Sequence, residues 1–457
     1  MGLSYAAFVD GLTYEAIPED VRQVLRRSLC DTLGVAAIGS TTEIARITRD
    51  YATAFWQSGP NAPSSRILMH GRTASPAGAA FAGAFTVDSI DAHDGSSPCK
   101  GHAGSCIIPG LLALVDMMRC GGQTVTGRDL MLALALGYET AYRAGVTQHE
   151  TVPDYHTSGT WAALGLATGG GRLLGLEPDQ IRHAAGIAEY HAPRSQMMRC
   201  IAHPTMLRDG VGWGAPTGVS AIQMAQMGFT GAPAITAEGD GIEAWWGDLG
   251  ERWDIVTMTH YKRYPVCRWA HPAMDALKDL MTEHRLSHRD IDRIQVVTFH
   301  NAVELAGPEP QSMDELAYSI CFPVAMMAVR GKVGLDELQP AIFSDPDILR
   351  LSRRTELQED ETYNRLAKTE RWAHVALTLT DGRTLRSDPR RPKGDPDNPL
   401  SDEEFTRKFH LFADPVLGAE RAGELEALAL RFDDLPDEGF NHLLDLALEG
   451  QANKSRP

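Results

Sequence analysis

The sequence predicts a mainly α-helical protein, with one large all-helical domain and an α+β domain of about 130 residues inside or after it. Two observations support this fold class. Through the first ~270 residues, apolar side chains recur at helical spacing, and strand-like alternation is nearly absent. After His271, short valine-rich runs alternate between apolar and polar residues, and helical spacing returns after residue 400. A chain of 457 residues is long enough for two such domains.

The first part of the chain is expected to form a series of buried helices. A proline near its start and a glycine after its end delimit the first of them, Pro18–Ile38. Closely spaced alanines and glycines in Ala77–Ser89 and His156–Leu174 let neighbouring helices approach closely, and Gly169-Gly170-Gly171 is interpreted as such packing. Further helices are expected at Arg128–Tyr142, Glu177–Ala188 and Arg208–Gly228.

The second part of the chain contains the strand signals. Ile291–His300 alternates and is rich in valine, and Trp372–Asp381 runs into an Asp-Gly turn that is typical of a hairpin. Helical segments are expected between them at Asp314–Arg330 and Leu335–Phe343. A proline- and glycine-rich connection at 392–400 precedes helices at Asp402–Phe412 and Ala419–Leu448.

Composition excludes several classes of function. The 43 basic residues against 60 acidic ones give a net charge of −17, which argues against nucleic acid and anionic membrane surfaces as partners. No secretory signal and no apolar run of membrane-spanning length is found. The seven cysteines are scattered, without the spacing of a structural zinc site. We therefore expect a cytoplasmic protein with reduced thiols.

The most informative segment is Asp88–Pro109, DSIDAHDGSSPCKGHAGSCIIP. Glycines and prolines prevent a regular helix there, yet very apolar helices are expected on both sides. Ionisable groups held against an apolar body have shifted pKa values, which acid–base chemistry requires. The candidate catalytic residues are Asp91, Asp94, Lys100 and His102. The alternative is a solvated loop with surface salt bridges, and because a lone Asp/His set is a weak metal signal, we expect no metal.

Three more stretches carry candidate residues. His156 precedes a small-residue helix, where it would be either a neutral base or a capping residue. Arg208 offers a fork for a substrate carboxylate, or else forms an ordinary surface pair with Asp209. The segment 261–271, YKRYPVCRWAH, concentrates positive charge in an acidic chain and suggests an anionic ligand, the alternative being a solvated basic face. Its candidate substrate-binding residues are Lys262, Arg268 and His271.

These residue types together describe proton abstraction next to a carboxylate. Such a proton is weakly acidic, so its removal needs a positioned base and cations that stabilise the enolate charge. The sequence has no nucleotide-binding or nucleophile-elbow motif, and we expect no cofactor.

The same stretches together resemble the MmgE/PrpD family, which includes 2-methylcitrate dehydratase, cis-aconitate decarboxylase and iminodisuccinate epimerase. The resemblance runs from about Val21 to Phe409. The motifs that carry it are IDAHDGSSPCKGHAGSCIIP, YHTSGTWAALG, GFTGAP, YKRYPVCRWAHPAMDAL, LAYSICFPVAMMAVRGKVG and PKGDPDNPL.

The resemblance implies a helical domain made of residues 1–271 and 401–457, with a lid domain of residues 272–400 inserted between them. It also implies a cofactor-free homodimer with the site in the cleft between the domains. By position, the site residues it implies are Asp91, His102, His156, Lys262 and His271.

The chain departs from the family pattern at Thr205 and Arg208, where many members have lysine and histidine, and at Phe322, where many have tyrosine. The missing lysine and the missing tyrosine phenol would remove two plausible proton donors. Lys100, two residues before His102, is therefore a candidate for the missing cationic role.

We expect a cofactor-independent lyase, most simply a dehydratase, that acts on a small di- or tricarboxylate. His102 or His156 would remove the proton, and Asp91 or Asp94 would orient His102 or Lys100. Lys100, Arg208, Lys262 and Arg268 would bind the carboxylates and the intermediate. Epimerisation and decarboxylation remain open, since they pass through the same or a closely related intermediate. The alternative outside catalysis is a helical protein that only binds carboxylates.

Overall fold

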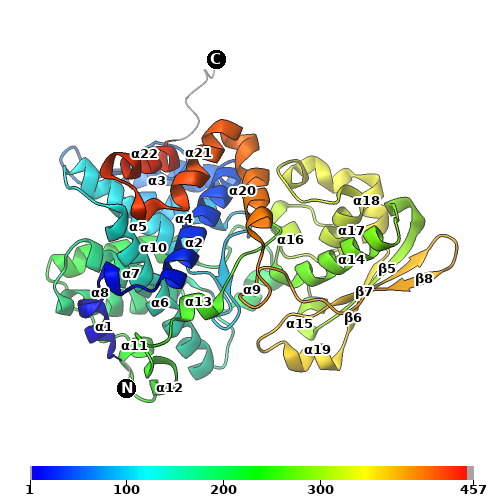
Figure 1. Cartoon of the computed structure of the whole chain (residues 1–457), viewed down its shortest axis with the longest axis horizontal. Coiled ribbons are helices and arrows are strands. Elements are labelled where there is room, and N and C mark those ends of the chain that lie inside the picture. Colours follow the sequence, from blue (N-terminus) through cyan, green and yellow to red (C-terminus); the bar gives the residue numbers. More distant parts are fainter. Residues whose placement is uncertain (1–2, 450–457) are drawn as a thin grey trace.

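The computed structural model describes residues 3–449 and confirms a mainly helical fold with a small mixed sheet in the second part of the chain (Figure 1). The helices before residue 260 are α1 (Tyr5–Gly11), α2 (Glu19–Gly39), α3 (Glu43–Phe55), α4 (Pro76–Asp88), α5 (Gly104–Cys120), α6 (Gly127–Thr151), α7 (Gly159–Leu173), α8 (Pro178–His191), α9 (Met197–Ala202), α10 (Val211–Gln226), α11 (Ile235–Glu238), α12 (Glu243–Trp246) and α13 (Asp254–Met258). After residue 400, the chain returns as α20 (Asp402–Leu417), α21 (Ala419–Ala429) and α22 (Asp437–Leu448).

The sheet lies at the end of the molecule opposite the helical domain (Figure 1). Its strand order is β6-β5-β7-β8, from β5 (Ile291–Thr298), β6 (Thr355–Glu359), β7 (His374–Leu379) and β8 (Thr384–Arg386). β5 runs parallel to β6 and antiparallel to β7, which pairs with β8 in the expected hairpin. The helices of this region are α14 (His271–Glu283), α15 (His300–Val303), α16 (Met313–Ala317), α17 (Cys321–Arg330), α18 (Pro346–Ser352) and α19 (Glu361–Leu366).

Short elements complete the fold. Two two-stranded pairs are formed by β1 (Ser65–Arg66) with β2 (Thr73–Ala74), and by β3 (Gly95–Ser96) with β4 (Thr259–His260). Single turns of 3₁₀ helix lie at Tyr14–Ala16, Arg268–Ala270, His288–Asp290, Asp336–Leu338, Pro340–Ser344 and Phe432–Asp434. No helix within residues 3–449 combines the length and the apolar character needed to cross a bilayer.

The buried apolar side chains form two clusters. One draws on residues 5–261 and 400–448, and the other on residues 264–379 together with Met197, Cys200 and Ile201 of α9. The last three residues come from the first part of the chain but pack against residues 264–379, which include the expected lid domain. The polar loop at 88–103 contains β3, which pairs with β4. Directly after β4 come Tyr261, a member of the first cluster, and Tyr264, a member of the second, so the loop lies near the place where the two clusters meet.

Glycines allow the central helices to pack closely. A Cβ atom at Gly165 of α7 would lie 2.3 Å from the Gly137 carbonyl oxygen of α6, and one at Gly169 would lie 2.2 Å from that of Ala133. Both distances are far below van der Waals contact, so no larger residue fits without moving the helices apart. The interpretation of the glycine run as close packing is confirmed at Gly169.

Three expected helices are interrupted, each beside a proline. The single helix expected at Asp314–Arg330 is wrong: the chain breaks at 318–320 between α16 and α17, because Pro323 is tolerated only in the first turn of a helix. The segment Leu335–Phe343 forms two 3₁₀ turns, with Pro340 starting the second. Ala419–Leu448 divides into α21 and α22, with Pro436 just before α22.

Strand β6 was not expected from the sequence. Its residues, TELQE, are mostly polar, and only Thr355 is buried, because β6 lies at the edge of the sheet. An edge strand with one exposed face has no apolar alternation to reveal it.

Lys408 of α20 forms a buried ion pair that ties the C-terminal helices to the rest of the helical domain. Its Nζ donates to the Asp31 carboxylate of α2 at 2.5 Å and to the Ala92 carbonyl oxygen at 2.8 Å. Both side chains are at most 5% exposed. Burial lowers the pKa of Lys408 and raises that of Asp31, against the mutual attraction of the pair.

Substitution of Lys408 by methionine is expected to destabilise the protein by about 3–5 kcal/mol, since it leaves the Asp31 carboxylate buried without a partner. Denaturant unfolding followed by circular dichroism measures the change. The neighbouring Arg407→Gln, which loses only an exposed pair with Glu403, is the matched control and should have a much smaller effect. Equal losses in the two variants would contradict the importance of the buried pair.

Candidate active site

A cavity of about 70 Å³ lies between the loop 88–103, the segment after β4 and the lid domain. Its wall includes five of the residues expected from the sequence: Asp91, Lys100, His102, Lys262 and Arg268. Tyr318 and Arg371 of the lid domain complete the wall, so both parts of the chain contribute. A space of this size suits a small molecule.

The loop that carries Asp91, Lys100 and His102 is buried. Asp91 is 7% exposed and His93 and Asp94 are fully buried, so the alternative of a solvated loop is wrong. The loop follows the C-terminus of α4 inside the protein, so its own backbone carbonyls need hydrogen-bond partners away from water. Three cations from distant segments supply those partners, and the carbonyl oxygens that they bind are Ser89 (from Arg208), Asp91 (from Lys262) and Ala92 (from Lys408).

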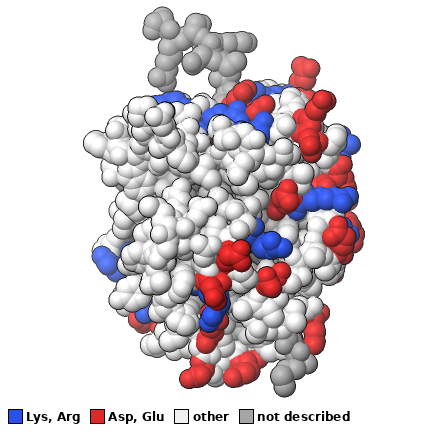
Figure 2. Space-filling model, turned by 90° about the vertical axis from the view of Figure 1, so that its left-hand side faces the viewer, with Lys and Arg blue, Asp and Glu red and all other residues white. Residues whose placement is uncertain are grey.

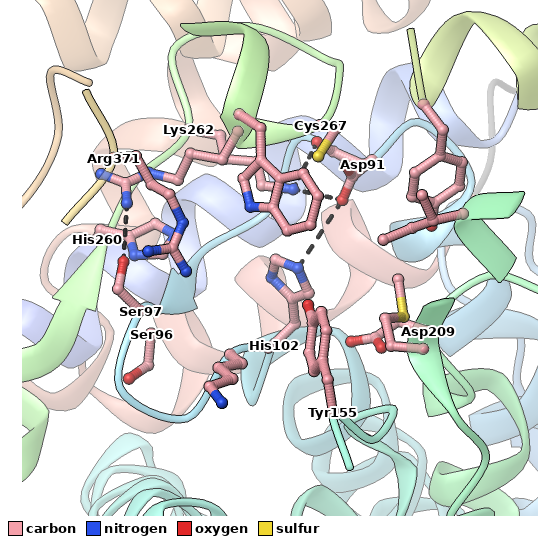
Figure 3. Close-up of a pocket in the computed structure, with 17 residues that line it drawn as sticks. Asp91, Ser96, Ser97, His102, Tyr155, Asp209, His260, Lys262, Cys267 and Arg371 are labelled. Carbon is pink, nitrogen blue, oxygen red and sulfur yellow. Dashed lines mark hydrogen bonds and ion pairs between the residues drawn. The ribbon is translucent and has the colours of Figure 1, made fainter. Parts of the chain in front are cut away.

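Asp91 lies between Lys262 and His102 (Figure 3). The Lys262 ammonium donates to the Asp91 carboxylate and, at 3.1 Å, to its carbonyl oxygen. The same carboxylate oxygen is 3.9 Å from Nε2 of His102. Because Lys262 is only 2% exposed, its charge depends on Asp91, and the pair fixes an ammonium group beside the imidazole.

His102 is held in one tautomer. Its Nδ1 lies 2.7 Å from the Asp94 carbonyl oxygen, which can only accept, so Nδ1 carries the hydrogen and Nε2 keeps a free lone pair. Burial, and next the Lys262 charge, hold the pKa of His102 well below its usual value. The backbone N–H of His102 donates to Ser158 Oγ at 3.0 Å, and Ser158 donates to Asp209. A neutral imidazole in this position is suited to accept a proton.

Two cations on the wall have no carboxylate partner within residues 3–449. Lys100 is half-buried, with Nζ 5.8 Å from the ring centroid of Tyr155. Burial, and next the charge of Arg371, lower its pKa. Arg371 donates to the backbone carbonyls of Ala367 and Glu370, both uncharged. By contrast, Arg268 is paired with Asp395 at 2.6 Å. The wall therefore has an excess of positive charge that an anionic ligand would neutralise.

Four expected site residues do not line the cavity: Asp94, His156, Arg208 and His271. Asp94 accepts from the Tyr138 hydroxyl at 2.8 Å, and burial raises its pKa to about 6. The backbone N–H of His156 donates to His149, while its Nδ1 is buried without a hydrogen bond. Nε2 of His271 lies 3.2 Å from the Val266 carbonyl oxygen. These three side chains lie behind the wall, where they support it.

Arg208 connects the two parts of the chain instead of pointing into the cavity. Its guanidinium donates to the Ser89 carbonyl at 2.7 Å and lies 2.7 Å from the Asp314 carboxylate of the lid domain. It is 2% exposed, and Asp209 is 4% exposed and bonded to Ser158. The alternative of a surface Arg208–Asp209 pair is therefore wrong.

Five further residues line the cavity that were not predicted as site residues from the sequence: Tyr155, Asp209, His260, Tyr318 and Arg371. Both ring nitrogens of His260 are buried without a hydrogen-bond partner, and burial holds its pKa well below the usual value. The pairing of β3 with β4 places it opposite Gly95, where a Cβ atom would lie 2.8 Å from His260 Nε2. The sequence signal that could have identified His260 is its position directly before the basic segment 261–271.

The cavity has proton donors despite Phe322. Phe322 is fully buried in the lid core, but Tyr318 and Tyr155 present phenols to the cavity. Burial raises the pKa of both phenols well above the usual value, so they keep their protons. Burial, and next the charge of Asp88, likewise raise the pKa of Asp209 well above its usual range. The phenol expected to be missing is thus available from another position.

Asp88, Asp91 and His93 are the described residues that could offer a metal ligand set, with ligand atoms within 4.8 Å of one another. However, the Asp91 carboxylate already binds Lys262, and Nε2 of His93 lies 3.1 Å from Asp88. An ammonium group already supplies the positive charge that a cation would bring, so this donor set fits a metal poorly.

Comparison with known families assigns the chain to the MmgE/PrpD family. The N-terminal domain of that family matches residues 4–250, and its C-terminal domain matches residues 264–434. The protein therefore belongs to the MmgE/PrpD family, whose members act on small carboxylates.

Individual relatives are distant but match over nearly full length. Cis-aconitate decarboxylase of Aspergillus terreus is 23% identical over 96% of this chain and 94% of its own. The human cis-aconitate decarboxylase is 24% identical over 95% of this chain and 92% of its own. The mouse cis-aconitate decarboxylase is also 24% identical, over 95% and 91% of the two chains.

His102 is expected to remain neutral well below pH 6.5, because burial and Lys262 both oppose its protonation. Imidazole ¹⁵N spectra recorded across a pH titration measure this directly, with His102→Gln to assign the signal. His300 is an internal control, since its hydrogen bond to Glu359 raises its pKa. Titration of the two histidines at the same pH would contradict the buried, neutral state of His102.

Proposed function

We propose that this protein is a cofactor-independent lyase that moves a proton at the carbon alpha to a carboxylate of a small di- or tricarboxylate. The observation that carries the proposal is the free Nε2 of His102, which faces a cavity with two cations, Lys100 and Arg371, that have no carboxylate partner among the described residues. A base without cations would leave the enolate charge unstabilised, and cations without a base would only bind.

The proposed first step uses His102 as the base. Nε2 takes the alpha proton, and the C–H electron pair moves into the adjacent carboxylate, which gives an enolate-like intermediate and an imidazolium. The Lys262 ammonium, beside the imidazole, stabilises the added negative charge. Asp91 then serves as a positioning residue, because its carboxylate holds Lys262 and faces the new imidazolium.

Two lyase outcomes follow from the proposed chemistry. In dehydration, a beta hydroxyl leaves as water after taking a proton from Tyr318, Tyr155 or Asp209, whose raised pKa values keep them protonated. Decarboxylation differs in its first step: the C–C bond to a carboxylate breaks in place of the C–H bond, CO₂ leaves, and the resulting carbanion, stabilised by the same cations, takes a proton from one of these acids. The names of the relatives favour decarboxylation of an unsaturated tricarboxylate. Reprotonation on the opposite face would instead give an epimerase.

A protein that only binds carboxylates is the alternative outside catalysis. Binding alone would need Lys100, Arg268 and Arg371 but not a neutral imidazole beside a buried Lys262–Asp91 pair. Burying these charged groups is unfavourable because they lose their hydration, and carboxylate binding alone does not require it. The arrangement therefore favours catalysis.

We also propose that the protein forms a homodimer through the helical domain. Figure 2 shows a broad area of that end of the molecule without charged side chains. Exposed large apolar residues occur on its helices and the loop after α10: Tyr51, Phe55, Tyr190, Trp213, Met227 and Phe229. Apolar surface of this kind is typical of subunit interfaces. Sedimentation that gives the 49.8 kDa monomer mass would contradict this.

Exchange in heavy water tests the proton-transfer step without knowledge of the product. NMR of a panel of small polycarboxylates, including citrate, cis-aconitate and methyl-substituted analogues, should show deuterium entering at one alpha carbon. His102→Gln should reduce the exchange rate by about 10²–10⁴-fold, the usual contribution of a general base. His203→Gln, outside the cavity lining, is the matched control. Undiminished exchange in His102→Gln would exclude His102 as the base.

Lys100→Met and Arg371→Met test whether these two cations bind a carboxylate group of the ligand. Each should weaken binding of a dicarboxylate by about 1.5–3 kcal/mol, the range for hydrogen bonds to charged groups. Calorimetric titration of each variant measures the loss, and a monocarboxylate analogue should lose less. Arg289→Gln, an exposed lid-domain cation, is the control. Unchanged affinity in both cavity variants would rule out this role.

A further inference from the structure

A second cavity, of about 110 Å³, lies where α14 and the end of α17 meet α20. We call it the basic crevice and define it by its charged lining residues, which are five cations and one acid: Arg263, Lys278, Lys332, Arg407, Lys408 and Glu404. This is a local excess of positive charge in a chain whose net charge is −17. It is separate from the candidate active site, with which it shares no lining residue.

Two of these cations lack an ion-pair partner in the part of the chain that the structure describes. Arg263 is 2.9 Å from Asp275 and 3.6 Å from Glu404, and Arg407 is paired with Glu403. Lys278 and Lys332, in contrast, make no ion pair with any residue between 3 and 449.

Lys278 lies among other charged groups of both signs, which include Arg263 and Arg407 of the crevice. Burial lowers its pKa, and the charges of Arg263 and Arg407 lower it further, despite the opposing carboxylates of Asp275 and Asp279. Lys278 is only half-buried, so its ammonium can still meet a ligand from solvent. A bound anion would relieve this repulsion.

We propose that the basic crevice binds a small, multiply charged anion, of the phosphate or polycarboxylate type, at a site distinct from the catalytic cavity. Lys278 and Lys332 belong to the lid domain and Arg407 to α20 of the helical domain, and these elements lie side by side (Figure 1). An anion that contacts all three clamps the two parts of the chain together.

The crevice is connected to the catalytic cavity through two pairs of consecutive residues. Arg263 follows Lys262, whose ammonium binds Asp91 in the cavity. Arg407 precedes Lys408, which holds the Ala92 carbonyl of the site loop. A ligand that fixes Arg263 and Arg407 therefore restrains both segments that support the loop.

Calorimetric titration of the full chain with phosphate, pyrophosphate and citrate, each at an ionic strength matched with NaCl, tests the proposal. At least one of these anions should bind, and the tightest of the three identifies the ligand class. Lys278→Gln combined with Lys332→Gln should weaken that binding at least tenfold. The control Arg289→Gln, which removes another exposed lid-domain cation, should leave it unchanged.

The catalytic cavity is excluded as the source of the signal with the Lys100→Met/Arg371→Met variant, in which the tightest-binding anion is titrated again and should still bind; citrate is judged in this variant alone, because it also fits the catalytic cavity. Loss of binding in that variant, equal binding in Lys278→Gln/Lys332→Gln, or no binding of any of the three anions would each overturn the proposal. If the double variant does not keep the wild-type thermal midpoint in NaCl, Arg407→Gln is used in its place with the same tenfold criterion.

Discussion

The C-terminal end of α4 is the point on which the site depends. Its chain leaves the helix inside the protein, where the unpaired carbonyls of Ser89, Asp91 and Ala92 cannot be hydrated. Three cations from segments more than 100 residues away along the chain satisfy them. Each cation must be buried to do so, and each is therefore paired with its own carboxylate. The site loop, the lid domain and the C-terminal helices are joined by this one requirement.

The same contacts stabilise an otherwise unfavourable backbone. Asp91, Lys100 and Arg208 all have left-handed φ angles of 51–54°, which non-glycine residues rarely adopt. Such conformations cost about 1–3 kcal/mol each and persist only where the surroundings determine them. The ion pairs of Asp91 and Arg208 provide those surroundings. Three of the five non-glycine residues with positive φ in the described part of the chain therefore form or support the candidate active site, and the other two, Met69 and Arg285, do not line it.

The sequence predicts local structure well because helical spacing and turn residues are local signals. It also identifies the loop that carries Asp91, Lys100 and His102, since charges in a glycine-rich segment between apolar helices are conspicuous. It does not predict which residue of a distant segment each buried side chain contacts in the folded protein. The interaction of Arg208 with Asp314 spans about a hundred residues and leaves no periodic trace. His260 and Arg371 likewise reach the cavity through strand pairing and lid placement, which no spacing along the chain encodes.

The charges on the cavity wall determine which ligands the cavity can enclose. Lys262 and Arg268 have carboxylate partners, but Lys100 and Arg371 have none within residues 3–449, and the charge of Arg371 contributes to the lowered pKa of Lys100. A neutral ligand would enclose both cations without compensation, at a cost that grows as water is excluded. A ligand with one carboxylate would pair with one of them. A ligand with a second carboxylate would neutralise both cations, and in the proposed reaction it would be held with its alpha carbon beside His102. The charge of the ligand and its position at the candidate base therefore depend on the same two side chains.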